Sequence, residues 1–194
     1  MNILFWILLG IVQALLLVKI VHSLWSFSAQ TPSDYWDHDP AFDIRERLSG
    51  ALDCEGIIYG PIGRVTSRFV AHFEADWTGN VGVMKEVFHY DSGRTQHREW
   101  TLTVNDTGRI VAAAPDLVGD GTGQQSGSSV LLNYTIRLDK EAGGHVLDVT
   151  DWMYLMENGV IMNRSQFRKF GIKVAELVAT MRPAAQSERK TLTV

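Results

Sequence analysis

The chain has 194 residues and is mildly acidic, with 18 Lys and Arg against 22 Asp and Glu, which gives a net charge of −4. Because it contains no basic runs, it lacks the electrostatic footprint of a nucleic-acid-binding protein, and we expect no nucleic-acid partner. Its single cysteine permits neither an internal disulfide nor a multi-cysteine metal site. The length that follows the apolar start is enough for one domain with a substantial core.

The first part of the chain is apolar: residues 3–18 carry no charge, and apolar side chains recur as far as Phe27. A helix over residues 5–25 would be roughly 30 Å long, which matches the thickness of a bilayer core. Aromatic residues lie near both of its ends, where interfacial aromatic belts form. We therefore expect residues 1–27 to be an uncleaved transmembrane anchor that contacts membrane lipid through residues 3–25. The alternative is a cleaved signal peptide.

A polar linker follows the apolar segment. Residues 28–41 are rich in polar side chains and have prolines near both ends of the stretch, as linkers do. Phe42, Leu48 and Leu52 then indicate a short helix or turn.

From Gly56 onward the hydrophobic period is two, as in β-strands. Residues 65–77 predict a long strand with one mainly apolar face. Hairpin-forming breaks separate further predicted strands at residues 83–90, 94–104, 109–114, 117–123, 130–138, 145–156, 160–168 and 170–181. The last of these also fits a terminal helix.

No break between these strands is long enough for a crossover helix, so the predicted sheet is antiparallel. Eight to ten short-looped strands favour an all-β, up-and-down barrel, since closure removes exposed edges. A two-sheet sandwich is the alternative. We expect the barrel domain to occupy residues 42–182 and to be followed by a disordered tail over residues 183–194.

Over roughly residues 42–181 the chain resembles an uncharacterised bacterial family, domain of unknown function number 3833, many of whose members look like lipoproteins. The segments that carry the resemblance are residues 60–69, 77–79, 86–93, 98–100, 151–154, 163–164 and 169–171. The resemblance implies a lipocalin-like β fold and supplies no established activity.

The resemblance also implies a place in the cell. It implies a barrel on the outer side of the inner membrane or in the periplasm. With the apolar start as a single-pass anchor, we expect a bacterial inner-membrane protein whose barrel lies on the periplasmic side. The chain lacks the acylated cysteine of a lipoprotein, since Cys54 lies far beyond the apolar start. The apolar segment would then replace the lipid anchor.

The hairpin at Asp91-Ser92-Gly93 is the most informative local feature. A three-residue loop pairs Glu86 with Arg98, whereas a two-residue loop pairs Glu86 with Glu99, which places like charges opposite one another. The three-residue register puts one set of side chains on a shared face: Met84, Glu86, Phe88, Tyr90, Arg98 and Trp100. If that face lines the barrel, Glu86 and Arg98 form a desolvated ion pair among aromatic rings. A structural pair that plugs the barrel, or the solvent face of an open sheet, is the alternative.

A second cluster combines Trp152 and Tyr154 with the next strand. A three-residue loop at residues 157–159 places Trp152 opposite Arg164 for a cation–π contact, and a two-residue loop places Tyr154 opposite Asn163. Core packing is the alternative role of both aromatic residues. The candidate ligand-binding residues are Trp77, Glu86, Phe88, Arg98, Trp100, Trp152, Tyr154 and Arg164.

Other chemistry finds no support in the sequence. The six histidines show no metal-ligand spacing, and the acidic residues 34–39 fit a solvated linker better than a cation loop. No Ser-His-Asp or paired-carboxylate arrangement predicts a catalytic centre. We therefore expect no metal and no cofactor.

Three functions remain. The first is a membrane-anchored binding protein whose barrel holds a hydrophobic or lipid-like small molecule at the membrane surface. The second is an accessory or scaffolding subunit of a membrane protein complex, and the third is a small enzyme that acts on an apolar substrate. A binding protein would have an apolar cavity, a scaffold would have a filled barrel with an exposed apolar patch, and an enzyme would have a perturbed carboxylate open to a cleft.

Overall fold

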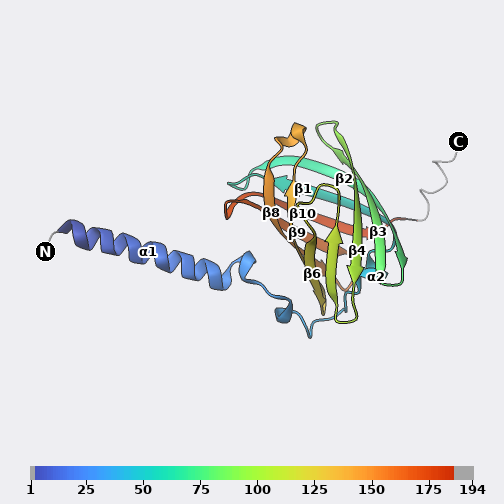
Figure 1. The fold of residues 1–194 in the computed structure, drawn as a ribbon, viewed down its shortest axis with the longest axis horizontal. Coiled ribbons are helices and arrows are strands. Elements are labelled where there is room, and N and C mark those ends of the chain that lie inside the picture. The colour runs from blue at the N-terminus through green and yellow to red at the C-terminus, as the bar shows by residue number, and fades with distance from the viewer. Residues whose placement is uncertain (1–2, 186–194) are drawn as a thin grey trace.

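The computed structural model describes residues 3–185, without the side chains of residues 22 and 23. Most of the predicted tail, residues 186–194, lies outside the described part. The chain begins with helix α1 (Ile3–Trp25), which projects away from a barrel, as Figure 1 shows. Within α1, Ile3–Val21 is long and apolar enough to cross a membrane, by length and composition.

The remaining elements are short helical turns and ten strands. The helical elements are η1 (Phe27–Ala29), η2 (Pro32–Asp34), α2 (Ile44–Arg47) and η3 (Lys140–Ala142). The strands are β1 (Gly50–Tyr59), β2 (Val65–Thr78), β3 (Val81–Tyr90), β4 (Thr95–Val104), β5 (Arg109–Ala113), β6 (Gly121–Ser126), β7 (Ser129–Arg137), β8 (Val146–Leu155), β9 (Ile161–Lys169) and β10 (Ile172–Pro183).

The strands form one closed antiparallel barrel. Each strand pairs with its neighbours in the sequence, and β1 closes the ring by pairing with β10, with Cys54 opposite Met181. Closure gives every strand two partners, so the sheet has no exposed edge. The predicted up-and-down barrel is confirmed, and the alternative sandwich is wrong.

Alternation along the strands explains why the chain folds this way. In β2, Phe69, Ala71, Phe73 and Ala75 are buried, and the residues between them are exposed. The same inward-facing rows continue around the barrel and form one core. A period of two gives each strand one apolar face, which only the barrel interior can bury.

Two elements differ from the prediction, and the structure decides between the two alternatives for the last segment. Strand β1 begins at Gly50 rather than after Gly56, because α2 ends at Arg47 and Leu52 already faces inward. Strand β6 begins at Gly121, since the chain before it forms a loop with a single isolated bridge at Leu117. The last segment is a strand, as predicted, and the alternative of a terminal helix is wrong, because β9 and β1 both pair with it.

The two ends of the barrel differ. At one end, called here the closed end, α2 and the residues beside it form a plug in which Phe42, Ile44 and Leu48 are at most 2% exposed. The indole N–H of Trp77 donates to the carbonyl of Leu48 at 2.7 Å and holds the plug in place. The opposite end, called here the mouth, is surrounded by the β1–β2, β3–β4, β7–β8 and β9–β10 hairpins and by the loop at residues 114–120.

The linker packs on the outer surface of the barrel. The Tyr35 ring lies 5.4 Å from the Trp152 ring and 5.5 Å from the Tyr154 ring. The Tyr154 hydroxyl donates to the Gln30 side chain at 2.8 Å, and the Phe42 amide donates to the Gly127 carbonyl. The linker therefore covers part of β8 before the chain turns into the plug.

Candidate functional site

The barrel encloses a cavity of about 750 Å³ that reaches from the plug to the mouth. Leu48 forms part of its floor, and Asp91, Arg94 and Glu141 lie at its mouth. Most of the wall is apolar, with Phe69, Phe73, Met84, Phe88, Leu132 and Met153 among the lining residues. A cavity of this size is within the range of small-molecule binding sites.

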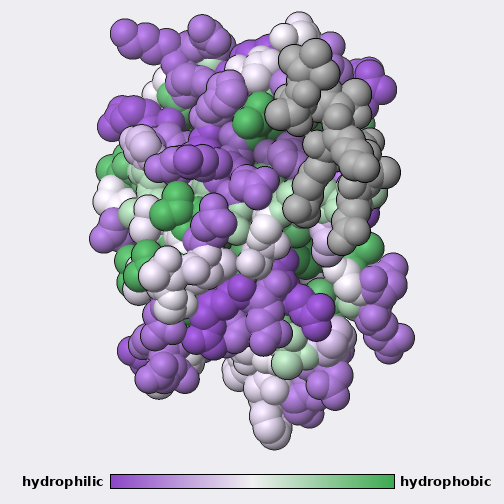
Figure 2. Space-filling view, turned by 90° about the vertical axis from the view of Figure 1, so that its right-hand side faces the viewer, coloured by the Kyte–Doolittle hydropathy of each residue, from purple (hydrophilic) through white to green (hydrophobic). Residues whose placement is uncertain are grey.

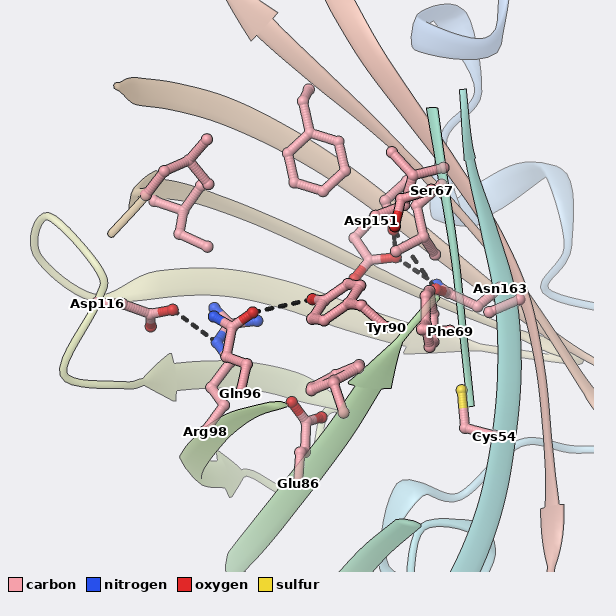
Figure 3. A pocket seen from close by; sticks show the side chains of 18 of the residues that line it. Cys54, Ser67, Phe69, Glu86, Tyr90, Gln96, Arg98, Asp116, Asp151 and Asn163 are labelled. Atoms are coloured by element: carbon pink, nitrogen blue, oxygen red, sulfur yellow. Dashed lines mark hydrogen bonds and ion pairs between the residues drawn. The ribbon is translucent and has the colours of Figure 1, made fainter. Parts of the chain in front are cut away.

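Glu86 and Arg98 lie opposite one another on β3 and β4, which confirms the three-residue register. Both side chains point into the cavity (Figure 3). No ion pair joins them in the described part of the chain. Arg98 instead pairs with Asp116, whose Oδ2 lies 2.8 Å from Nε.

The choice of Asp116 over Glu86 follows from solvation. The Asp116 side chain is 25% exposed, whereas Glu86 is almost fully buried. Burial raises the pKa of Glu86 to about 7, although the nearby Arg98 cation lowers it. A carboxyl group of this kind is partly protonated near neutral pH and is a weak partner for a guanidinium.

Aromatic rings flank the Arg98 guanidinium. Its central carbon lies 4.0 Å from the Trp100 ring centre and 5.7 Å from that of Tyr134. The two rings also contact each other edge to face at 5.2 Å. Cation–π contact on the ring faces stabilises a charge that burial has stripped of water.

A second polar group lies across the cavity, on β8 and β9. The Asp151 carboxylate accepts hydrogen bonds from Asn163 at 2.5 Å and from Ser165 at 2.8 Å, and Tyr134 donates to it more weakly at 3.5 Å. Burial raises the pKa of Asp151, although these hydrogen bonds lower it. This carboxyl group is therefore satisfied by the protein itself.

The first polar group is not satisfied. Glu86 Oε2, Arg98 Nη2 and Asp116 Oδ1 are buried and have no hydrogen-bond partner among the described residues. Buried polar atoms are almost always paired, because an unpaired one loses its hydration without compensation. The three residues line the cavity, and these atoms are a donor and acceptors beside it that no described protein group satisfies.

The structure brings only half of the candidate ligand-binding residues to this cavity. Glu86, Phe88, Arg98 and Trp100 line it. The other four, Trp77, Trp152, Tyr154 and Arg164, do not.

Trp152 and Tyr154 point outward because Asp151 and Met153 take the inward positions of β8. They stack on one another at 5.9 Å beneath the linker, so Trp152 is fully buried outside the cavity. Trp152 lies opposite Arg164, as the three-residue loop predicts. Arg164 nevertheless stacks on Phe27 at 4.7 Å and pairs with Glu176, and not with Trp152.

Sequence reasoning missed three residues of the site. Asp151 occupies an inward position of the otherwise apolar alternation of β8, and this polar residue in an apolar row is a signal that the sequence contains. Tyr134 lies in the inward row of β7 and carries the same kind of signal. Asp116 lies in a loop without any pattern, so only the folded chain reveals it.

No group of three or more His, Cys, Asp or Glu that could hold a metal ion occurs among the described residues.

A closed antiparallel barrel around a cavity that opens at one end defines a lipocalin-like protein. The model of the family "Protein of unknown function (DUF3833)" matches residues 21–183, and the chain belongs to this family. No curated protein matches the chain.

Two solved structures share the fold. The crystal structure of Rv2717c from M. tuberculosis is 16% identical, with a TM-score of 0.53, and the match covers 77% of this chain and 100% of that one. A protein of unknown function from the DUF3598 family of Nostoc punctiforme (NPUN_R4044) is 10% identical, with a TM-score of 0.53. That match covers 76% of this chain and 51% of the other. At these identities the similarity shows the fold alone.

Proposed function

We propose that the barrel binds an amphiphilic small molecule, with its apolar part along the cavity wall and its polar end at Glu86, Arg98 and Asp116. The observation that carries this proposal is an apolar cavity of about 750 Å³ that contains buried polar atoms without partners in the described chain. A barrel with a purely structural interior would fill such a space, because cavities and unpaired polar atoms both cost stability.

The polar groups indicate what the ligand carries. Arg98 offers a buried donor, Asp116 offers an acceptor, and Glu86 can donate or accept because its pKa is near 7. A carboxyl or hydroxyl group satisfies such a set, and charge-assisted hydrogen bonds would fix its orientation. Phe88 and Trp100 supply apolar contact beside it. A single-chain lipid with such a head has the required chemistry.

The proposal includes a membrane anchor. Helix α1 has a bilayer-length apolar stretch with none of its residues buried against the barrel. Anchored in this way on the periplasmic side of a bacterial inner membrane, the barrel would work close to a reservoir of apolar ligands. A scaffolding role has weaker support, since a scaffold requires no internal cavity.

The test is mass spectrometry of lipid extracted from the full chain, purified from membranes without denaturation. Ala175 lines the cavity, so Ala175→Trp is expected to fill the space and abolish the bound mass. Val111 is 47% exposed on the outer surface, so Val111→Trp is the matched control and keeps it. The same lipid content in both variants, or none in the wild type, contradicts the proposal.

One observation favours a second candidate, an enzyme that uses Glu86 for acid–base chemistry. A buried carboxyl group with a pKa of about 7 in a cavity can both donate and accept a proton at neutral pH. The test is incubation of the extracted lipid with the wild type and with Glu86→Gln. Conversion by the wild type alone would establish catalysis, and unchanged lipid in both would leave binding as the function.

A further inference from the structure

Two hairpins at the mouth expose apolar side chains. Ile62 in the β1–β2 hairpin is 85% exposed, and Phe170 and Ile172 at the β9–β10 hairpin are 91% and 69% exposed. Because β1 pairs with both β2 and β10, the two hairpins lie side by side. Ile62, Phe170 and Ile172 are called here the mouth patch.

The backbone conformation of Phe170 is a second unfavourable feature of this residue, beside the exposure of its ring. Its φ of 53° lies in the left-handed region, and no other non-glycine residue of the described chain has a positive φ. This turn position favours Gly, Asn or Asp, so a bulky aromatic residue there costs stability. Its side chain recovers little of that cost, since it is almost fully exposed. A surface that receives the ring would account for its presence.

The charge around the mouth patch is basic, although the whole chain has a net charge of −4. Residues 60–69 and 166–175, which form the two hairpins, contain no acidic residue and five basic ones: Arg64, Arg68, Arg168, Lys169 and Lys173. Arg68 and Lys173 pair with Asp91 and Glu176. The other three make no ion pair with an acidic residue in the described chain. Apolar tips within a basic border are typical of surfaces that bind anionic bilayers.

The position of the hairpins agrees with such a surface. Both extend on the side of the barrel toward which α1 projects, as Figure 1 shows. The opposite face, in Figure 2, is mostly hydrophilic with scattered apolar residues. The hairpins also border the cavity, since Thr66 and Ser67 on one and Ala175 on the other line it.

We propose that the mouth patch docks on the surface of a bilayer that contains anionic lipids. Phe170 and Ile62 enter the boundary between headgroups and acyl chains, while Arg64 and Lys169 contact lipid phosphates. The cavity then opens onto the membrane. This inference rests on the proposed function for the identity of the cargo, but docking itself can be measured without any cargo.

The experiment uses the full chain in vesicles of phosphatidylcholine, with and without phosphatidylglycerol. Cys54, the single cysteine, is replaced by Ala, and an environment-sensitive fluorophore is attached through Phe170→Cys. The control carries it through Met156→Cys, because Met156 is exposed and apolar at the closed end. We expect a blue shift of emission and quenching by nitroxide-labelled lipid at position 170 and neither at position 156. Phosphatidylglycerol is expected to strengthen both effects.

A second pair of variants tests the patch itself. With the fluorophore attached through Ile62→Cys, Phe170→Ser is expected to reduce the quenching and Met156→Ser to leave it unchanged. Arg64→Gln combined with Lys169→Gln is expected to weaken the dependence on phosphatidylglycerol.

Two outcomes overturn the inference. One is a solvent-like emission at position 170, and the other is a blue shift without quenching by lipid, which indicates contact with another protein or a second copy. Lipid extracted from the same purified protein before it is added to the vesicles separates the two proposals. Bound lipid without docking overturns this inference alone, and docking without bound lipid overturns the proposed cavity function alone.

Discussion

A carboxyl group buried among aromatic rings makes the stability of this protein depend on pH. The pKa of Glu86 rises from an ordinary value of 4.5 to about 7 in the folded chain, chiefly because of burial. Between these values the folded chain keeps a proton that the unfolded chain releases, so the free energy of unfolding falls as pH rises from about 4.5 to 7. The loss amounts to about 3 kcal/mol.

We expect Glu86→Gln to remove most of this pH dependence and to stabilise the protein above neutral pH. Urea unfolding at several pH values, followed by tryptophan fluorescence, measures the effect. The raised pKa of Asp151 leaves a slope of the same sign in the variant. Parallel pH profiles of the variant and the wild type would show that Glu86 is ionised in the fold.

Arg98 is the buried cation of the site, with a side chain only 13% exposed. Arg98→Ala leaves the Asp116 carboxylate without its partner and is expected to cost about 3 kcal/mol of unfolding free energy. Arg68→Ala is the control, because Arg68 is 70% exposed in its pair with Asp91, and such pairs contribute about 0–1 kcal/mol. Equal losses in the two variants in urea unfolding would contradict a special role for the buried cation.

Cys54 offers a direct report on occupancy of the cavity. It lines the cavity, and burial raises the pKa of its thiol to about 12, so little thiolate is present at neutral pH. We expect slow alkylation by iodoacetamide in the folded protein, a faster reaction as pH rises, and a further slowing when an amphiphilic ligand is added. Mass spectrometry of the intact protein gives the rate of alkylation at Cys54 directly, since the chain has one cysteine. Alkylation that is unaffected by a ligand bound at saturation would place the ligand outside the cavity.

The plug formed by α2 is short, but it sets the depth of the cavity. Leu48 is 2% exposed and forms part of the cavity floor. Leu48→Ala is expected to cost about 2–5 kcal/mol of unfolding free energy, because it removes buried methyl groups and leaves a void. Val111→Ala on the exposed outer surface is expected to change stability by no more than about 0.5 kcal/mol. A loss at Leu48 as small as that of the control would mean that the plug is not part of the folded core.

The strands and their register could be predicted from the sequence, because the alternation of apolar residues and the residue preferences of tight turns are local properties. The like-charge clash of Glu86 with Glu99 was enough to select the register of β3 and β4, and the structure confirms it. The ion-pair partner of Arg98 could not be predicted, because Asp116 lies in a loop whose position depends on the closed barrel. Trp152 shows the same limit, since the linker that covers it lies more than a hundred residues away in the chain.

Whether α1 remains attached decides where the barrel works, and this stays a prediction. We expect the protein in membranes to retain residues 3–25, because α1 has the length and composition of a membrane span. The periplasmic side of the barrel is expected from the family resemblance alone. Mass spectrometry of the N-terminal peptide and a cytoplasm-specific reporter fused after Val194 measure these two properties. A mature N-terminus near Ala29 would contradict the anchor, and an active reporter would contradict the topology.

The pairing of β1 with β10 imposes an order on the folding of the chain. Every other pairing joins strands that follow one another in the sequence, so successive hairpins can form while the polypeptide is still being made. The seam between residues 52–59 and 176–183 cannot close until the final strand has left the ribosome. Until then β1 and the newest strand present unpaired edges, which is the state most exposed to aggregation. A chain that stops before Ile172 would therefore give an open, adhesive sheet rather than a smaller barrel.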